Sequence, residues 1–192
     1  MNRLLLTTFL LLTFALSQAQ VGFRFESVEA LSPVINGEYE ENSPVYDPID
    51  KRLYFSRTLH PDNKGGKTVG QDLWYSDFDG NAWSQPSNDL NKLNNYLNNV
   101  TIGLSKDGQR MYMIGTYIKK VSLQSGFSMT EKKEDGDWPR PETVEVDNLN
   151  IKSPFYGGYI SPSEDILIIS MESFNSMGQE DLYVSLKTAN GW

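Results

Sequence analysis

The sequence predicts an all-β fold, namely a β-propeller built from four-stranded antiparallel blades. One segment recurs along the chain, because Trp83, Trp138 and Trp192 stand 55 and 54 residues apart and similar residues precede each of them. The recurring segments are short, rich in β-branched and aromatic residues, and bounded by Gly, Pro, Asn and Asp. No stretch between Gln20 and Trp192 keeps a helical hydrophobic period for three turns.

Each repeat is interpreted as four short strands, here named A to D in chain order. We expect strand A at about 43–46, 99–104 and 155–160, strand B at about 52–57, 110–114 and 166–170, and strand C at about 72–77, 127–132 and 181–186. Strand D is expected to begin at or near each tryptophan. Asp-Gly and Asn-Gly pairs supply hairpin turns between strands.

Repeated four-stranded units of about 55 residues favour a propeller, because each unit can bury its faces only against its neighbours. The units are expected at about 36–90, 91–151 and 152–192. Closed propellers have roughly four to eight blades, so we expect about three blades of an incomplete propeller. The stretch at about 23–30 aligns with a strand D, and we expect it to close the ring by completing the last blade.

Residues 1–19 have the pattern of a secretory signal peptide. Arg3 precedes an apolar run from Leu4 to Leu16, and Ser17-Gln18-Ala19 supplies small residues for cleavage. The run is too short to span a bilayer, and it lacks the amphipathic face of a buried core helix. We therefore expect export and a mature chain of residues 20–192.

Composition argues against several classes of partner, anchor and cofactor. Loss of Arg3 with the signal takes the formal net charge from −8 to −9, which argues against nucleic acid as a partner. The chain has no cysteine, so it has neither a disulfide framework nor a lipid-carrying cysteine after the signal. No later apolar run is long enough to cross a membrane. No cofactor is expected, since no glycine-rich phosphate loop follows a strand and opens a helix.

Two motifs with catalytic or metal-binding associations are present only in part. "SDFDGNAW" nearly matches the Asp box of sialidase-type propellers, but Phe78 and Ala82 replace its aspartate and threonine. Asp77, Asp79 and Asn81 suggest calcium, but the later glycine and final glutamate of an EF-hand loop are missing. The one histidine, His60, rules out a multi-histidine zinc site. We therefore expect neither a catalytic nor a metal site.

The repeated segments resemble a known family. "SPVYDPIDKRLYFSR", "GQDLWYS" and "GNAWSQP", echoed by "GYISPSEDILIIS", "GQEDLYVS" and "NGW", look like the WD40-like, TolB-related propeller repeats of bacterial envelope proteins. Such repeats often precede the peptidoglycan-binding part of OmpA-family outer-membrane proteins. The resemblance covers residues 36–192 and implies the periplasm or outer membrane of a Gram-negative bacterium, with outer-membrane association through sequence beyond Trp192.

The repeat motif itself is expected to be structural. Leu73, Tyr75, Trp83 and their counterparts are expected to pack between blades. Asp72 and Asp181 follow Gly-Gln and Gly-Gln-Glu, where a carboxylate can accept backbone N–H groups and fix the start of strand C. In the second repeat Phe127 is aligned with these aspartates. The residues of this structural motif are Asp72, Trp83, Trp138, Asp181 and Trp192.

Three functions fit these observations. The first, which we favour, is a non-catalytic envelope module that binds a protein, a peptide or a cell-wall component such as peptidoglycan or another glycan. The second is a carbohydrate-active propeller enzyme of the sialidase or glycosidase kind, for which no spacing singles out a carboxylate pair. The third is an architectural spacer between the membrane and a peptidoglycan-binding domain.

Strand direction predicts the binding face. In an antiparallel A-B-C-D unit the A–B and C–D turns lie at one end, and the B–C loops and D–A linkers lie at the other. The B–C loops at 57–71, 115–125 and 171–180 and the asparagine-rich linker 87–98 are long and differ between repeats, as recognition loops on a scaffold do, although merely solvated loops would look the same. The residues expected to contact an anionic or mixed-charge partner are Arg57, His60, Lys64, Lys67, Tyr117, Lys119 and Lys120.

Overall fold

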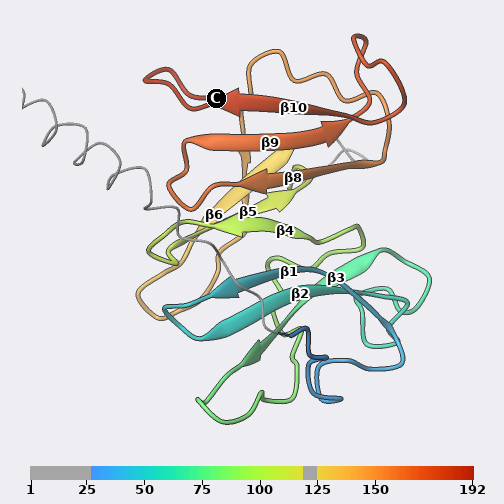
Figure 1. Cartoon of the computed structure of the whole chain (residues 1–192), viewed down its shortest axis with the longest axis vertical. Helices are drawn as coiled ribbons and strands as arrows, with labels where there is room; N and C mark the ends of the chain where they lie inside the picture. The colour runs from blue at the N-terminus through green and yellow to red at the C-terminus, as the bar shows by residue number, and fades with distance from the viewer. Residues whose placement is uncertain (1–26, 119–124) are drawn as a thin grey trace, which may run out of the picture. The chain divides into compact units, whose positions relative to one another are not determined.

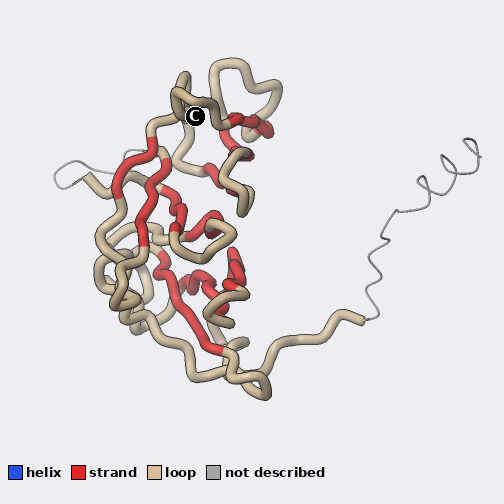
Figure 2. Tube along the Cα trace, turned by 90° about the vertical axis from the view of Figure 1, so that its left-hand side faces the viewer, coloured by secondary structure: helices blue, strands red, loops and turns tan. Residues whose placement is uncertain are grey.

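The computed structural model describes residues 27–118 and 125–192. The chain divides into two units, Met1–Ala30 and Leu31–Trp192. Residues 27–30 of the first unit have no regular secondary structure, and the expected signal peptide and residues 23–26 of the expected closing strand lie outside the described residues. Figure 2 shows that the described chain consists of strands and loops without a helix.

Ten strands of the second unit form three antiparallel sheets. Sheet 1 contains β1 (Glu40–Asp47), β2 (Arg52–Thr58) and β3 (Gln71–Asp77). Sheet 2 contains β4 (Thr101–Leu104), β5 (Arg110–Ile114), β6 (Phe127–Glu131) and β7 (Glu142–Val144). Sheet 3 contains β8 (Tyr156–Ile160), β9 (Ile166–Met171) and β10 (Asp181–Leu186). Strands that follow one another in the chain are neighbours in each sheet, so the all-β prediction is confirmed.

Strands A, B and C of every repeat lie where the sequence places them, within about three residues. Strand D does not, because only sheet 2 has a fourth strand, and β7 begins four residues after Trp138. In the first repeat the chain after Trp83 forms isolated bridges, Phe78 with Trp83 and Tyr75 with Ser87. At Leu73 of β3, the Asn94 side chain makes the hydrogen bonds that a neighbouring strand would make. Its Oδ1 accepts from Leu73 N and its Nδ2 donates to Leu73 O, both at 2.9 Å.

The first strands of the three sheets lie next to one another. β4 contacts both β1 and β8, so the A strands lie side by side (Figure 1). Each of these strands is an edge of its own sheet, and no sheet closes on itself. Gly103 of β4 allows the approach to β8, because a Cβ on this residue would lie 2.6 Å from Cγ2 of Ile160.

Apolar side chains fill the spaces between the sheets. Tyr54, Leu73 and half-buried Tyr75 of sheet 1 pack with Met111 and Met113 of sheet 2. Tyr112, Phe127 and Met129 of sheet 2 pack in the same way with Leu167, Ile169 and Met171 of sheet 3. We name Tyr54, Leu73 and Tyr75 the forward face of sheet 1. Tyr112, Phe127 and Met129 are the forward face of sheet 2. Leu73 and Tyr75 thus lie between sheets 1 and 2.

Strand register corrects the alignment of the second repeat. Arg52 pairs with Asp77, Arg110 with Glu131 and Ile166 with Leu186. Phe127 precedes Glu131 by as many residues as Leu73 precedes Asp77 and Leu182 precedes Leu186. Phe127 therefore occupies the position of Leu73 and Leu182, and not that of Asp72 and Asp181. The alignment on tryptophan was wrong because the second repeat has one more residue between strand C and its tryptophan.

The forward face of sheet 3 is exposed. Its residues are Ile168, Leu182 and Val184, which correspond by register to Tyr54, Leu73 and Tyr75. Leu182 is 76% exposed and Val184 is 64% exposed, whereas Leu73 and Tyr54 are fully buried. An apolar sheet face of this kind marks a surface that another element can cover.

The described part of the chain contains no helix with the length and apolar character needed to cross a membrane.

Candidate functional site

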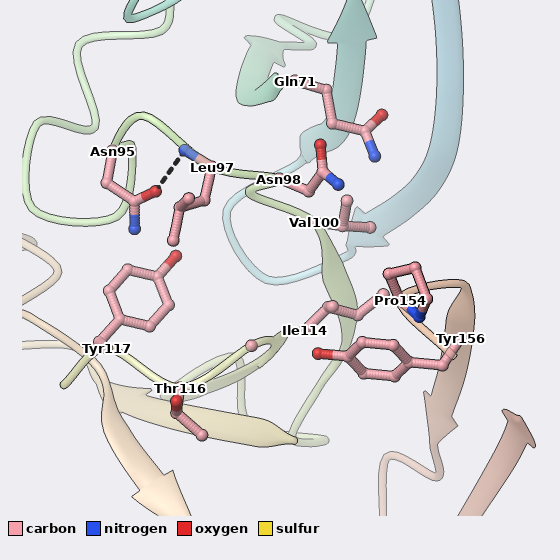
Figure 3. A pocket seen from close by; sticks show the side chains of 11 residues that line it. Gln71, Asn95, Leu97, Asn98, Val100, Ile114, Thr116, Tyr117, Pro154 and Tyr156 are labelled. Carbon is pink, nitrogen blue, oxygen red and sulfur yellow. Dashed lines mark hydrogen bonds between the residues drawn. The ribbon is translucent and has the colours of Figure 1, made fainter. Parts of the chain in front are cut away.

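A small pocket lies at the loop end of the sheets, on the face that the sequence predicts for binding. Its volume is about 90 Å³. The start of β3, the linker before β4, the loop after β5 and the segment before β8 form its walls (Figure 3). The lining residues are Gln71, Asn95, Leu97, Asn98, Val100, Ile114, Gly115, Thr116, Tyr117, Pro154 and Tyr156.

A buried asparagine holds the linker wall in place. The Asn99 side chain is fully buried, and its Nδ2 donates to the carbonyl oxygens of Gln71, Asn95 and Leu97 at 3.0–3.2 Å. Gly70 lets the linker pass close to the start of β3, because it has a φ of +63° and a Cβ there would lie 2.3 Å from the Leu97 carbonyl oxygen. The asparagine-rich linker is therefore ordered by its own amides.

Two tyrosines form the opposite side of the pocket (Figure 3). The Tyr117 hydroxyl donates to the Leu93 carbonyl at 2.7 Å. The Tyr156 hydroxyl donates to Gly126 O and accepts from Gly126 N, both at 3.1 Å. Burial raises the pKa of Tyr117 and the pKa of Tyr156 above the ordinary tyrosine value. Both phenols are therefore neutral near neutral pH and serve as fixed walls.

The unused polar groups of the pocket are amides. Gln71 Oε1 accepts from Asn42 and Thr58, and Asn95 Oδ1 accepts from Leu97 N at 2.8 Å. The amino groups of Gln71 and Asn95 and the whole side-chain amide of Asn98 have no hydrogen-bond partner among the described residues. No charged side chain lines the pocket. The arrangement can hold a small neutral polar group, but it supplies no group that would transfer a proton near neutral pH.

Two of the residues expected to contact a partner are instead buried. Arg57 is 6% exposed, donates to Glu41 and to the Ile35 carbonyl at 3.1 and 2.8 Å, and stacks on Trp74. Tyr117 is 9% exposed and lines the pocket from within. Arg57 joins β2 to β1 and to the segment before β1. Tyr117 joins the loop after β5 to the linker at Leu93.

His60, Lys64 and Lys67 lie beside sheet 1. The His60 ring lies 4.5 Å from both Tyr39 and Trp74, and its Nδ1 accepts from Asp62 N. Burial, followed by the charge of Arg57, lowers the pKa of His60. Lys64 Nζ donates to the Asn94 carbonyl at 3.3 Å, whereas Lys67 is exposed beside Tyr39. Lys119 and Lys120 lie outside the described residues.

The repeat aspartates anchor the loops that precede strand C. Asp72 Oδ2 accepts from Lys64 N at 2.7 Å, and Asp181 Oδ2 accepts from Met177 N at 2.6 Å. Asp72 is almost fully buried, and its burial raises its pKa. This geometry matches the structural role that the Gly-Gln context indicates.

The repeat tryptophans do not share one environment. Trp138 is buried between sheets 1 and 2, and Trp192 packs against the cluster between sheets 2 and 3. Trp83 does not lie between two of the described sheets, because it packs with Leu53, Phe55 and Trp74 on the other side of sheet 1.

The aspartates considered for calcium have other partners. Asp77 forms a bidentate ion pair with Arg52 at 2.6 and 2.9 Å. Asp79 Oδ1 accepts from the backbone N–H groups of Asn81 and Ala82, both at 2.8 Å, which is ordinary turn geometry. Within residues 27–118 and 125–192, no group of three or more His, Cys, Asp or Glu side chains is placed to hold a metal ion.

Sequence reasoning missed the amides and the second tyrosine of the pocket. Gln71, Asn95, Asn98 and Tyr156 come from three separate segments, and only the asparagine-rich composition of 87–98 gave a signal. Comparison with protein-family models, with curated proteins and with solved structures found no match to this chain. The likeness to WD40-like envelope repeats therefore stays a prediction.

Proposed function

We propose that this chain is a non-catalytic, exported module of the cell envelope that binds a protein, a peptide or a cell-wall component through its loop end. The observation that carries the proposal is the neutral, amide-lined pocket at the end of the sheets where the B–C loops and the linkers meet. Variable loops on a rigid scaffold are the usual place for recognition, and a pocket with a few convergent polar groups is the usual form of a binding site.

The scaffold in this proposal is an incomplete propeller with WD40-like blades. Two successive sheet interfaces use the same forward-face positions, which supports a repeated blade arrangement. The exposed forward face of sheet 3 supports incompleteness, since Leu182 and Val184 would be buried there by a further blade. The A strands β1, β4 and β8 would then be the inner strands of the blades.

Binding without catalysis is favoured by the chemistry of the pocket. A general acid or base needs a pKa near the working pH, and the lining residues offer amides and two tyrosines whose pKa values are raised further from neutrality. A glycosidase would need two carboxyl groups facing one cleft, and none lines this pocket.

A paired substitution tests whether the loop end is the binding face. Asn98→Trp places a large ring at the pocket from an exposed position, and Asn81→Trp makes the same change in an exposed turn at the other end of sheet 1. Each protein is immobilised and incubated with solubilised envelope proteins and with purified cell-wall sacculi, and the captured material is quantified. Circular dichroism checks that both variants are folded.

We expect Asn98→Trp to reduce capture at least about tenfold, which corresponds to a loss of about 1.4 kcal/mol, and Asn81→Trp to capture as the unmodified chain does. Loss of capture with Asn81→Trp and unchanged capture with Asn98→Trp would place binding at the turn end and refute the proposal.

A further inference from the structure

The size of the pocket limits what can enter it. An engineered protein cavity of about 150 Å³ holds one benzene molecule, so the pocket of about 90 Å³ has room for a smaller group. A pyranose ring is too large, whereas a group such as an acetamide fits. A pocket of this size can admit only a substituent of a larger ligand.

The chemistry of the walls fits a neutral amide. Val100 and Ile114 offer apolar surface for a methyl group (Figure 3). The free amino group of Gln71 can donate to a carbonyl oxygen, and the side-chain amide of Asn98 can both donate and accept. A carboxylate or an ammonium would lose its hydration here without gaining an opposite charge, which is costly.

Two exposed aromatic residues belong to segments that form the pocket walls. Tyr96 stands between the lining residues Asn95 and Leu97 and is 65% exposed. Phe155 stands between the lining residues Pro154 and Tyr156 and is 74% exposed. Figure 3 places these two wall segments on opposite sides of the pocket. Aromatic rings offer flat apolar surface to the C–H faces of sugar rings, which favours a glycan over a peptide as the larger ligand.

We propose that the pocket binds the acetamido group of an N-acetylated sugar within a glycan strand, with Tyr96 and Phe155 contacting the strand on either side. This inference rests on the proposed function and names the ligand of the same site. Gln71 and Asn98 supply the polar contacts, and Val100 and Ile114 contact the methyl group.

Isothermal titration calorimetry with two sugars tests it. The probes are a β-1,4-linked tetramer of N-acetylglucosamine and the corresponding tetramer of glucose, in which a hydroxyl replaces each acetamido group. The proteins are the unmodified chain, Asn98→Leu, the double variant Tyr96→Ala with Phe155→Ala, and Asn81→Leu as a matched control on the opposite face.

We expect the N-acetylated tetramer to bind at least about tenfold more tightly than the glucose tetramer, because one or two hydrogen bonds at roughly 0.5–1.5 kcal/mol each are lost with the acetamido group. Asn98→Leu should reduce the difference between the two sugars, the aromatic double variant should weaken both, and Asn81→Leu should change neither. Equal affinity for the two tetramers, or no binding of the N-acetylated one, overturns the inference.

The capture experiment with Asn98→Trp distinguishes failure of the sugar assignment from failure of the proposed binding face. If the N-acetylated tetramer fails to bind but Asn98→Trp still abolishes capture of an envelope component, the sugar assignment is wrong and the binding face stands. If Asn98→Trp leaves all capture unchanged, both proposals fail.

Discussion

The indole nitrogen of Trp138 donates a hydrogen bond to the phenol oxygen of Tyr54 at 3.2 Å. Tyr54 belongs to β2 of sheet 1 and Trp138 to the segment that follows sheet 2's β6, so this contact joins two repeats. Both side chains are buried, at 0% and 3% exposure. A donor and an acceptor that are both removed from water depend on each other.

Tyr54→Phe should therefore destabilise the chain by about 1–3 kcal/mol, the usual cost of leaving a buried donor without a partner. The phenyl ring keeps the apolar packing, so the loss reports the hydrogen bond. Urea denaturation followed by tryptophan fluorescence measures it. Tyr46→Phe is the matched control, because Tyr46 is 49% exposed, and equal losses in the two variants would contradict the prediction.

Arg110 and Glu164 join sheets 2 and 3, and the contact is pH-dependent. Arg110 Nε lies 2.7 Å from Glu164 Oε1, and the Tyr112 hydroxyl lies 2.6 Å from the same oxygen. The bond from Arg110 lowers the pKa of Glu164 below its ordinary value of 4.5. The unfolded state then takes up the proton more readily, so this stabilisation is complete above pH 4.5 and is lost as the pH falls through the lower folded pKa.

Urea midpoints measured between pH 3 and pH 7 test this. Glu164→Gln should lose about 1–3 kcal/mol at pH 7, and its deficit relative to the unmodified chain should shrink below pH 4.5. Glu131→Gln removes a carboxylate that is 66% exposed and 4.0 Å from the same arginine, and it should have little effect. A deficit that does not change with pH would show that the charge of Glu164 is unimportant.

His60 should make stability sensitive to mild acid. Burial and the nearby Arg57 lower its pKa below the ordinary value of 6.5, so the folded chain favours the neutral ring. The unfolded state binds the proton first, and stability should therefore decrease as the pH falls below 6.5 and level off below the folded pKa. His60 is the only histidine in the sequence, so His60→Gln should remove this slope above about pH 5, where carboxyl groups of ordinary pKa have not yet titrated. A slope that persists in the variant would contradict the assignment.

The exposed forward face of sheet 3 should promote association. Leu182 occupies a position that is buried in sheets 1 and 2, and Val184 occupies one that is half-buried there. Exposed apolar sheet faces and edges are prone to self-association. Leu182→Ser with Val184→Ser should shift the chain toward the monomer in size-exclusion chromatography and light scattering at increasing concentration. The same changes at exposed Leu31 and Val28 serve as the control.

An unmodified chain that stays monomeric at all concentrations, with a sharp two-state unfolding transition, would contradict both this prediction and the incomplete propeller.

The sequence predicted the strands well because their composition is local information. "RLYFS", "RMYMI" and "ILIIS" are short, apolar and followed or preceded by turn residues, and the structure has strands at these places. The prediction from sequence failed at strand D of the first repeat, where side-chain contacts take the place of the hydrogen bonds between strands C and D. The Asn94 side chain bonds the edge of β3 at Leu73, and no pattern in "NKLNNYLNN" indicates that an amide would take the place of a strand.

The site could be predicted only as a face. Antiparallel connectivity correctly implies that the B–C loops and linkers share one end, and the pocket lies there. The sequence did not indicate that Arg57 and Tyr117 would be buried, because charge and position along the chain do not show which other segments cover a side chain. It also did not bring Gln71, Asn98 and Tyr156 together, since their proximity depends on the packing between repeats.

The most direct test is a nuclear magnetic resonance titration of the ¹⁵N-labelled chain with the N-acetylglucosamine tetramer. We predict that the largest shifts will occur at the side-chain amides of Gln71, Asn95 and Asn98 and at the backbone amides of Ile114 and Tyr156, which line the pocket. Shifts confined to the turns at 48–51 and 79–82, at the opposite end of sheet 1, or the absence of shifts at saturating sugar, would contradict the account.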